Sequence, residues 1–432
     1  MRNLDRAQYL SRDELHSLQS AKLRSIVRHA FENVAFYRKK FDAAGLTPDD
    51  IRETGDLAKI PITNKKDIQA ALPGELLSRG IDPAKCIVKN TSGSTGTPLR
   101  FFVNARERDF QRLLNLRIFL AGGFRLTDKT AYIINPHRFP DGKYWFQDYG
   151  ILRRYYLSVF DSAEKHADAL RRIRPDIVYG YPSNLTLLAL AIKEGGIADI
   201  RPKAVFSSAE ALEKQPRALI EAAMKTKVYD VLGLVETGDI AWECPAKEGY
   251  HVNSDAVAME FLDESDRPVA PGERGRLVCT NLYTYTMPLI RYEAGDICVP
   301  SGGTCSCGRT LPLMESIKGR ANDFIVLPDG KIVASCFLVI LMQSFHEVAQ
   351  YRVIQERRES IVMQIVKGER FSESTPGRIA EEVGRITGNR LKVEMAFLDA
   401  LPRDASGKIR TVMSKVVPGL QSRILDYAGG GE

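Results

Sequence analysis

The sequence predicts an α/β protein in which a large N-terminal domain, built on a doubly wound and mainly parallel sheet, precedes a small α+β domain. Between residues 86 and 233, short apolar runs alternate with amphipathic stretches of about 10 to 15 residues, the order that parallel strands and crossover helices require. After residue 324 the order becomes strand, helix, strand, strand, helix, strand. A chain of 432 residues is long enough for two hydrophobic cores, and we place the domains at 1–319 and 320–432.

Each expected element rests on a local pattern. Apolar residues recur at helical spacing through residues 1–45, Asn64 is placed to cap a short helix, and Gly122 ends an amphipathic helix that starts near residue 106. The strands expected in the large domain lie within 86–88, 99–103, 131–135, 176–180, 202–208 and 227–233, and in the small domain within 331–335, 349–356, 359–364 and 391–398. Further helices are expected up to about residue 173, after residue 182, and over 338–345 and 376–387.

Composition and charge exclude several classes of protein. Hydrophobic residues make up 44% of the chain and charged residues 27%, which is ordinary for a globular domain. The net charge of +7 arises from 61 basic and 54 acidic residues that are mixed along the chain, which favours nucleotides over nucleic acid as anionic partners. The sequence contains no apolar run long enough to span a membrane and no signal peptide, so we expect a cytoplasmic protein without a membrane partner. Seven cysteines, an odd number, argue against a disulfide framework and favour metal binding or simple burial.

A loop rich in hydroxyl groups lies between two strand-like runs. Residues 91–97 are all Thr, Ser or Gly, and Pro98 follows them. Glycine allows the backbone to approach a ligand closely, and hydroxyl and N–H groups can surround phosphate oxygens. The loop is not a Walker A sequence, because no Gly-Lys-Ser/Thr follows it. The alternative interpretation is a solvated turn.

Several stretches of the chain resemble the motifs of the adenylate-forming enzymes, which include acyl-CoA synthetases, adenylation domains and luciferases. The resemblance is strongest to the phenylacetate–CoA ligase-like branch, and within it to a subgroup encoded with capsule polysaccharide genes. It covers nearly the whole chain. The stretches that carry it are residues 29–38, 60–68, 88–99, 155–161, 179–183, 207–210, 229–238, 289–296, 317–323 and 401–411.

The resemblance implies an ATP- and Mg²⁺-dependent ligase that forms an acyl- or aryl-adenylate and then an acyl-CoA thioester, releasing pyrophosphate and AMP. It implies catalytic roles for Lys408 and Glu236, with Glu236 as the Mg²⁺ ligand. The residues implied to bind the nucleotide are Ser92, Gly93, Ser94, Thr95, Gly96, Thr97, Ser208, Ala209, Glu210, Asp230, Gly233, Asp296 and Arg320. Those placed near the acid are His137, Tyr181 and Ser207. In the family, the small domain rotates between an adenylating and a thioester-forming pose, so we expect it to be mobile.

Plainer interpretations stand beside these roles. Glu236 and Lys408 are also explained as solvated side chains, His137 as a surface residue, Tyr181 as part of the core, and Glu210 as a cap of the next helix. The sequence departs from the family at Val235, where Thr or Ser is usual, and at Asn322, where an acid is usual. A scaffold that binds nucleotide without catalysis is therefore an alternative hypothesis.

The partners expected are a small carboxylic acid and an acyl acceptor. The acceptor is CoA in the leading hypothesis, and a carrier-protein thiol or an amine in the alternative. Members of this branch are often dimers, so a homodimer is also an open expectation. Nothing in the sequence identifies the acid.

Three cysteines and one histidine form a candidate zinc site. They are Cys244, His251, Cys305 and Cys307, a donor set that suits tetrahedral Zn²⁺. The Cys-x-Cys spacing is unlike that of zinc fingers, and more than 50 residues separate the two pairs. Members of the resembled branch look zinc-bound at matching positions, which favours zinc over the alternative of a reduced, buried cysteine group.

Overall fold

The computed structural model describes residues 2–90, 99–140, 142–317, 324–330, 332–334, 338, 341–342, 344–345, 347–401 and 412–416. Contacts divide the chain into two compact units. Unit 1 comprises Met1–Asn90, Leu99–Gly122 and Val231–Gly319, and unit 2 consists mainly of Gly123–Asp230 and Arg320–Glu432. Strand β7 (Lys227–Leu234) supplies residues to both units.

The N-terminal part of unit 1 is helical. Ser11 caps α2, because its hydroxyl accepts from the Glu14 N–H while the Glu14 carboxylate accepts from the Ser11 N–H. Asn64 caps the next helix but one in the same reciprocal way with Asp67, as the sequence predicts. The helices of this part are α1 (Arg2–Ala7), α2 (Arg12–Asn33), α3 (Ala35–Ala43) and α4 (Lys65–Ala70).

A hairpin and one long helix follow. Strands β1 (Ile87–Asn90) and β2 (Arg100–Val103) pair antiparallel and flank the hydroxyl-rich loop in sequence. Helix α5 (Ala105–Ala121) begins at an Asn104 cap and ends at Gly122, followed by Gly123 with a φ of +90°.

Antiparallel strands complete unit 1. Their order is β10-β11-β12-β13-β9-β8, and β8 then pairs with residues 231–234 of β7. The bounds are β8 (Gly238–Glu243), β9 (Tyr250–Val252), β10 (Val257–Leu262), β11 (Gly275–Asn281), β12 (Tyr292–Pro300) and β13 (Leu313–Ile317).

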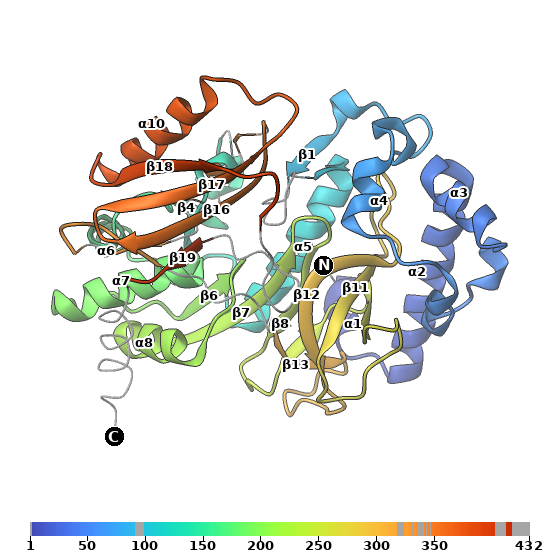
Figure 1. Cartoon of the computed structure of the whole chain (residues 1–432). Coiled ribbons are helices and arrows are strands. Elements are labelled where there is room, and N and C mark those ends of the chain that lie inside the picture. Colours follow the sequence, from blue (N-terminus) through green and yellow to red (C-terminus); the bar gives the residue numbers. More distant parts are fainter. Residues whose placement is uncertain are drawn as a thin grey trace. The chain divides into compact units, whose positions relative to one another are not determined.

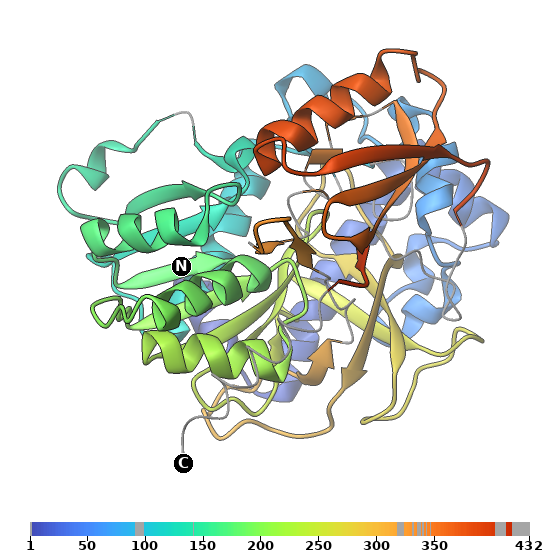
Figure 2. The same ribbon diagram turned by 60° about the vertical axis from the view of Figure 1, so that its left-hand side comes forward.

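Unit 2 contains the parallel strands. In the order β7-β6-β5-β3-β4, the pairs β6–β5, β5–β3 and β3–β4 are parallel. Helices α6, α7 and α8 lie side by side along these strands in both views (Figures 1 and 2) and form with them one buried core. The bounds are β3 (Lys129–Ile134), β4 (Arg153–Ser158), α6 (Ala163–Ile173), β5 (Ile177–Gly180), α7 (Pro182–Glu194), β6 (Ala204–Ser208) and α8 (Lys214–Met224).

The C-terminal part of unit 2 has a sheet of its own, in the order β18-β17-β16-β19. Helix α10 lies along this sheet (Figure 1) and packs Ile379 and Val383 into its core. The elements are β14 (Phe324–Val326), β15 (Ile332–Ala334), β16 (Val348–Arg357), β17 (Ser360–Lys367), α10 (Thr375–Thr387), β18 (Lys392–Phe397) and β19 (Val412–Ser414).

The predicted α/β class is confirmed, and parallel pairing is present among β3, β4, β5 and β6, over residues 129–208. The antiparallel strands after residue 238 were not predicted, because short runs joined by tight turns carry a weaker pattern than strands separated by helices. Within the predicted helix over 338–345, residues 338, 341 and 342 are helical, and residues 339, 340 and 343 lie outside the described residues. None of the helices in the described part of the chain combines the length and apolar character needed to cross a lipid bilayer.

Candidate active site and metal centre

Glu236 lies in the turn between β7 and β8, where the sequence predicts a Mg²⁺ ligand. The turn is closed by Gly238, whose φ of +76° favours glycine. The Glu236 side chain is only 9% exposed, and its Oε1 accepts a hydrogen bond of 3.1 Å from the Tyr292 hydroxyl. A buried carboxylate that accepts from a neutral hydroxyl is chemically suited to bind a cation.

The charges around Glu236 come from elements far apart in the sequence. Burial raises its pKa, while the charge of Lys65 and the bond from Tyr292 lower it, and the charge of Asp296 raises it further. The predicted residues Glu236 and Asp296 are therefore close enough for their charges to interact. Asp296 is half-buried on β12, four residues after Tyr292.

Lys65 and Tyr292 are two members of this group to which sequence reasoning gave no role. The residues before Lys65 pair with β12, since Thr63 donates its N–H to Arg291 O at 2.8 Å and accepts from Glu293 N at 2.9 Å. The stretch around Lys65 was interpreted as a helix cap and packing helix. Its closeness to Glu236 depends on this long-range pairing, which no local pattern signals.

Arg291, in the motif predicted around Asp296, anchors the start of β12. Its backbone φ is +49°, and its buried guanidinium forms an ion pair with Glu260 at 3.2 Å and donates to Ile60 O at 2.7 Å. A buried, paired arginine in a left-handed conformation is held by the surrounding fold. Arg291 thus fixes the strand that carries Tyr292 and Asp296.

In unit 2, the predicted residues at the end of β6 are already bonded to one another. The Ser207 hydroxyl donates to Asp230 on β7, and both residues are buried. Glu210 accepts from the N–H of Ser183 at 2.9 Å and from its hydroxyl at 3.0 Å. Glu210 therefore caps α7, the helix before it in the sequence, whereas the alternative interpretation assigned it to the helix after it.

Ala209, between these two side chains, has a φ of +74°. It is exposed, so its methyl group packs little. Left-handed backbone costs a residue with a Cβ about 1–2 kcal/mol, and such strain clusters at ligand-binding turns.

Relief of this strain is testable. Because glycine also gains entropy in the unfolded chain, Ala209→Gly is expected to raise the free energy of unfolding by only about 0.5–1 kcal/mol. Urea denaturation measures this change, with Ala211→Gly as the matched control. A decrease in stability for Ala209→Gly would show that the turn is unstrained.

Some of the remaining predicted residues are described by the structure, and the others lie outside its described part. Tyr181 is buried before α7, Ser208 is buried, and Gly233 lies on β7 opposite Asp239. The backbone of His137 is in a 3₁₀ turn, Pro136–Arg138, and its side chain lies outside the described part. Ser92, Gly93, Ser94, Thr95, Gly96, Thr97, Arg320 and Lys408 also lie outside the described residues.

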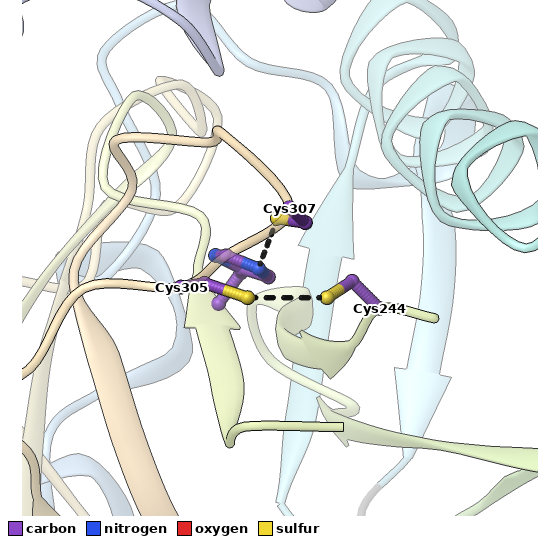
Figure 3. A group of neighbouring side chains, drawn as sticks. Cys244, Cys305 and Cys307 are labelled. Carbon is purple, nitrogen blue, oxygen red and sulfur yellow. Dashed lines mark hydrogen bonds between the residues drawn. The ribbon is translucent and has the colours of Figure 1, made fainter. Parts of the chain in front are cut away.

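The four predicted zinc ligands converge in unit 1 (Figure 3). Cys244 follows β8, His251 is on β9, and Cys305 and Cys307 lie in the β12–β13 connection. Pairing of β13 with β9, with Leu313 opposite His251, brings the two halves together. The four ligand atoms all lie within 4.8 Å of one another.

The distances within this cluster suit a metal better than a disulfide. Cys244 Sγ and Cys305 Sγ are 3.5 Å apart, and Cys307 Sγ and His251 Nε2 are 3.4 Å apart (Figure 3). A disulfide needs about 2.05 Å. Tetrahedral Zn²⁺ with bonds of about 2.3 Å to sulfur and 2.0 Å to nitrogen separates its ligands by about 3.5–3.8 Å.

The histidine is in the form that binds a metal. Burial and the charge of Arg309 lower the pKa of His251 to about 4, so its imidazole is neutral at physiological pH. Burial raises the pKa of Cys305 to about 12. A cation that displaces the thiol proton would offset the cost of burying the negatively charged thiolate.

Comparison with known proteins identifies the relatives of the chain. Residues 325–415 match the family model described as the CapK C-terminal domain. A phenylacetate-coenzyme A ligase of Escherichia coli (strain K12) is 30% identical over 369 residues, covering 82% of each chain. Protein CapK of Staphylococcus aureus is 21% identical over 425 residues, covering 94% of this chain and 90% of that one.

A solved structure shares the fold. It is 2-hydroxyisobutyryl-CoA ligase in complex with 2-HIB-AMP and CoA in the thioesterification state, with a TM-score of 0.67 and 23% identity over 98% of this chain and 94% of that one. This structural similarity agrees with an architecture of one large N-terminal domain and one small C-terminal domain. Together with the E. coli relative, it confirms the resemblance inferred from the motifs. The chain belongs to the phenylacetate–coenzyme A ligase family of adenylate-forming acid–thiol ligases.

Proposed function

We propose that the protein activates a small carboxylic acid with ATP, releases pyrophosphate, and passes the acyl group from the adenylate to coenzyme A with release of AMP. The observation that carries this proposal is the Glu236 carboxylate, buried within charge range of Asp296 and Lys65 in a chain of this family. The E. coli relative is named for phenylacetate and coenzyme A, and the solved relative binds a 2-hydroxyisobutyryl adenylate and CoA. These names support a small acid and CoA as substrates.

The residues of unit 1 bind and orient the nucleotide. Glu236 holds Mg²⁺, for which a buried oxygen donor is suited, and Asp296 accepts the ribose hydroxyls. When bound, Mg²⁺ supplies positive charge that offsets the charge of the phosphates. Tyr292 and Arg291 keep Glu236 and β12 in place.

The residues of unit 2 serve the same reaction. The turn at Ser208 and Ala209 contacts the adenine through its backbone. The bonds from Ser207 to Asp230 and from Ser183 to Glu210 hold that turn. The roles of the others are the ones that the family motifs imply: Ser92, Gly93, Ser94, Thr95, Gly96, Thr97, Gly233 and Arg320 bind nucleotide, His137 and Tyr181 lie near the acid, and Lys408 stabilises the charge that develops in adenylation.

Pyrophosphate release tests this function. The purified protein is incubated with ATP, Mg²⁺ and a panel of aryl, fatty, sugar and amino acids, first without an acceptor. A signal with one acid supports adenylation and identifies the acid. The variant Lys408→Ala should still bind ATP but lose the signal, whereas a non-catalytic scaffold gives no signal in either form.

The acceptor is tested next. With the active acid present, CoA is compared with a carrier-protein thiol and with simple amines, and the acylated product is identified by mass spectrometry. A CoA thioester supports the proposal. Transfer only to carrier protein or amine would retain adenylation and overturn the assignment of CoA.

We also propose that Cys244, His251, Cys305 and Cys307 bind a structural Zn²⁺. Their convergence and mutual distances support this, and a site with four protein ligands leaves no position for substrate. We further propose a domain boundary at residues 319 and 320 with a hinge in the motif of residues 317–323, which the range matched by the CapK C-terminal model supports. We also propose that the protein is cytoplasmic, that it forms a homodimer, and that its small domain is mobile.

A further inference from the structure

The backbone of the turn that carries Glu236 accepts a hydrogen bond from a tyrosine hydroxyl group. Tyr283 donates its Oη–H to the carbonyl of Thr237 at 2.5 Å. Thr237 follows Glu236 directly, and Gly238 completes the turn with its left-handed backbone. The Tyr283 bond therefore fixes the peptide immediately after the proposed Mg²⁺ ligand.

Helix α5 determines where Tyr283 lies. The Glu107 carboxylate accepts from the N–H groups of Tyr285 at 2.7 Å and Thr286 at 2.8 Å. The rings of Phe110 and Tyr283 have centroids 4.6 Å apart. Two independent contacts, one polar and one aromatic, thus hold the Tyr283 segment on one helix.

One turn along α5, Gln111 joins this arrangement to the hairpin β1–β2. A Cβ atom added at Gly238 would lie 3.2 Å from both Gln111 Cγ and the Tyr283 hydroxyl oxygen, so the two side chains meet at that glycine. Gln111 Oε1 accepts from the ammonium group of Lys89 on β1. Lys89 is two residues before Thr91, where the hydroxyl-rich loop begins.

We propose that Lys89, Gln111 and Tyr283 form a positioning relay that links the hairpin flanking the hydroxyl-rich loop to the turn carrying Glu236. The inference rests on the proposed function, since it assigns the relay to placing Glu236 for metal-bound ATP. Tyr283 is a positioning residue, because it acts through the Thr237 carbonyl and touches no reacting atom. The relay explains why the half-buried side chains of Tyr283, Gln111 and Lys89 come together at the turn that carries Glu236.

Tyr283→Phe tests the relay, because it keeps the ring on Phe110 and removes the bond to Thr237. Losing a net hydrogen bond is expected to raise the Mg²⁺ concentration that half-saturates pyrophosphate release by about threefold to tenfold, with little change in kcat at saturating Mg²⁺. The matched control is Tyr285→Phe, in the same segment, whose ring packs on His29. The control should match wild type.

Binding without turnover separates this inference from the proposed function. Mn²⁺·ATP binding, followed by electron paramagnetic resonance, should weaken by the same factor in Tyr283→Phe and remain unchanged in Tyr285→Phe. If wild type binds Mn²⁺·ATP and Tyr283→Phe binds it equally well, the relay is overturned while the proposed function stands. If wild type neither binds Mn²⁺·ATP nor releases pyrophosphate, both fall.

A second variant covers the case in which Tyr283→Phe misfolds. Lys89→Met keeps most of the aliphatic stem and removes the donor to Gln111, and it should weaken Mn²⁺·ATP binding in the same direction. In the double variant, members of one relay should give a combined loss smaller than the product of the single losses. Independent, multiplicative losses would contradict the relay.

Discussion

Glu236→Gln is expected to lower the rate of pyrophosphate release by about 10²–10³-fold, the cost of removing one charged group from a site that stabilises developing charge. Glutamine has nearly the shape of glutamate and retains an oxygen to accept from Tyr292, which bonds Glu236 at 3.1 Å. What it lacks is the negative charge that holds a divalent cation. The loss should appear in steady-state assays as a reduced kcat and a weaker response to Mg²⁺.

The stability of the same variant distinguishes a functional from a structural role. A carboxylate at 9% exposure whose pKa burial raises is costly to keep ionised in the unliganded protein. Glu236→Gln should therefore melt at the same temperature as wild type or higher, while activity collapses. A lower melting temperature together with the loss of activity would instead assign Glu236 to the fold.

Glu243→Gln provides the matched control. Glu243 is equally exposed, at 9%, and lies at the end of β8, where it pairs with Lys247 at 3.0 Å. Replacing this carboxylate by an amide should leave pyrophosphate release within about twofold of wild type, because Glu243 is already paired with the half-buried Lys247 and has no proposed contact with substrate. Equal losses in both variants would contradict a specific role for Glu236.

Local patterns in the sequence were sufficient for the parallel part of the fold. Gly122 ends α5 and Asn64 caps α4 because capping depends on residues a few positions apart. The alternation of strands and helices predicts β3, β5, β6 and β7 for the same reason, whereas β4 was not predicted. The antiparallel strands depend on which runs pair, and pairing partners are not encoded in a local period.

In the candidate site, too, sequence motifs indicate some of the residues, whereas other contacts depend on long-range pairing. The family motifs indicate Glu236 and Asp296, but the bond from Tyr292 and the charge of Lys65 arise from pairing between Thr63 and β12. The capping of α7 by Glu210 was missed because the Ser183 N–H that it accepts from lies 27 residues earlier in the chain. The zinc ligands were predicted from residue type together with the family resemblance, and the β13–β9 pairing that joins them was not predicted.

Cys244→Ser is expected to abolish zinc binding and to lower the melting temperature by at least about 5 °C. A serine hydroxyl is a poor Zn²⁺ ligand, and the remaining thiols and imidazole would be left buried without the cation that offsets their burial. Cys244 follows β8, His251 is on β9, and Cys305 and Cys307 lie in the β12–β13 connection, so a bound ion would cross-link three segments of one sheet. Losing a link between segments separated by more than 50 residues destabilises the folded state relative to the unfolded chain.

Metal analysis by inductively coupled plasma mass spectrometry and thermal melting measure the two effects together. Wild type should contain about one zinc per chain, and a strong chelator should lower its melting temperature toward that of Cys244→Ser. Cys86→Ser is the matched control, because Cys86 lies outside the cluster and its thiol donates to Asp82 O at 3.5 Å. Wild type that is purified without zinc, and whose melting temperature changes neither with a chelator nor with added Zn²⁺, would show that the four residues form a reduced thiol group without a metal.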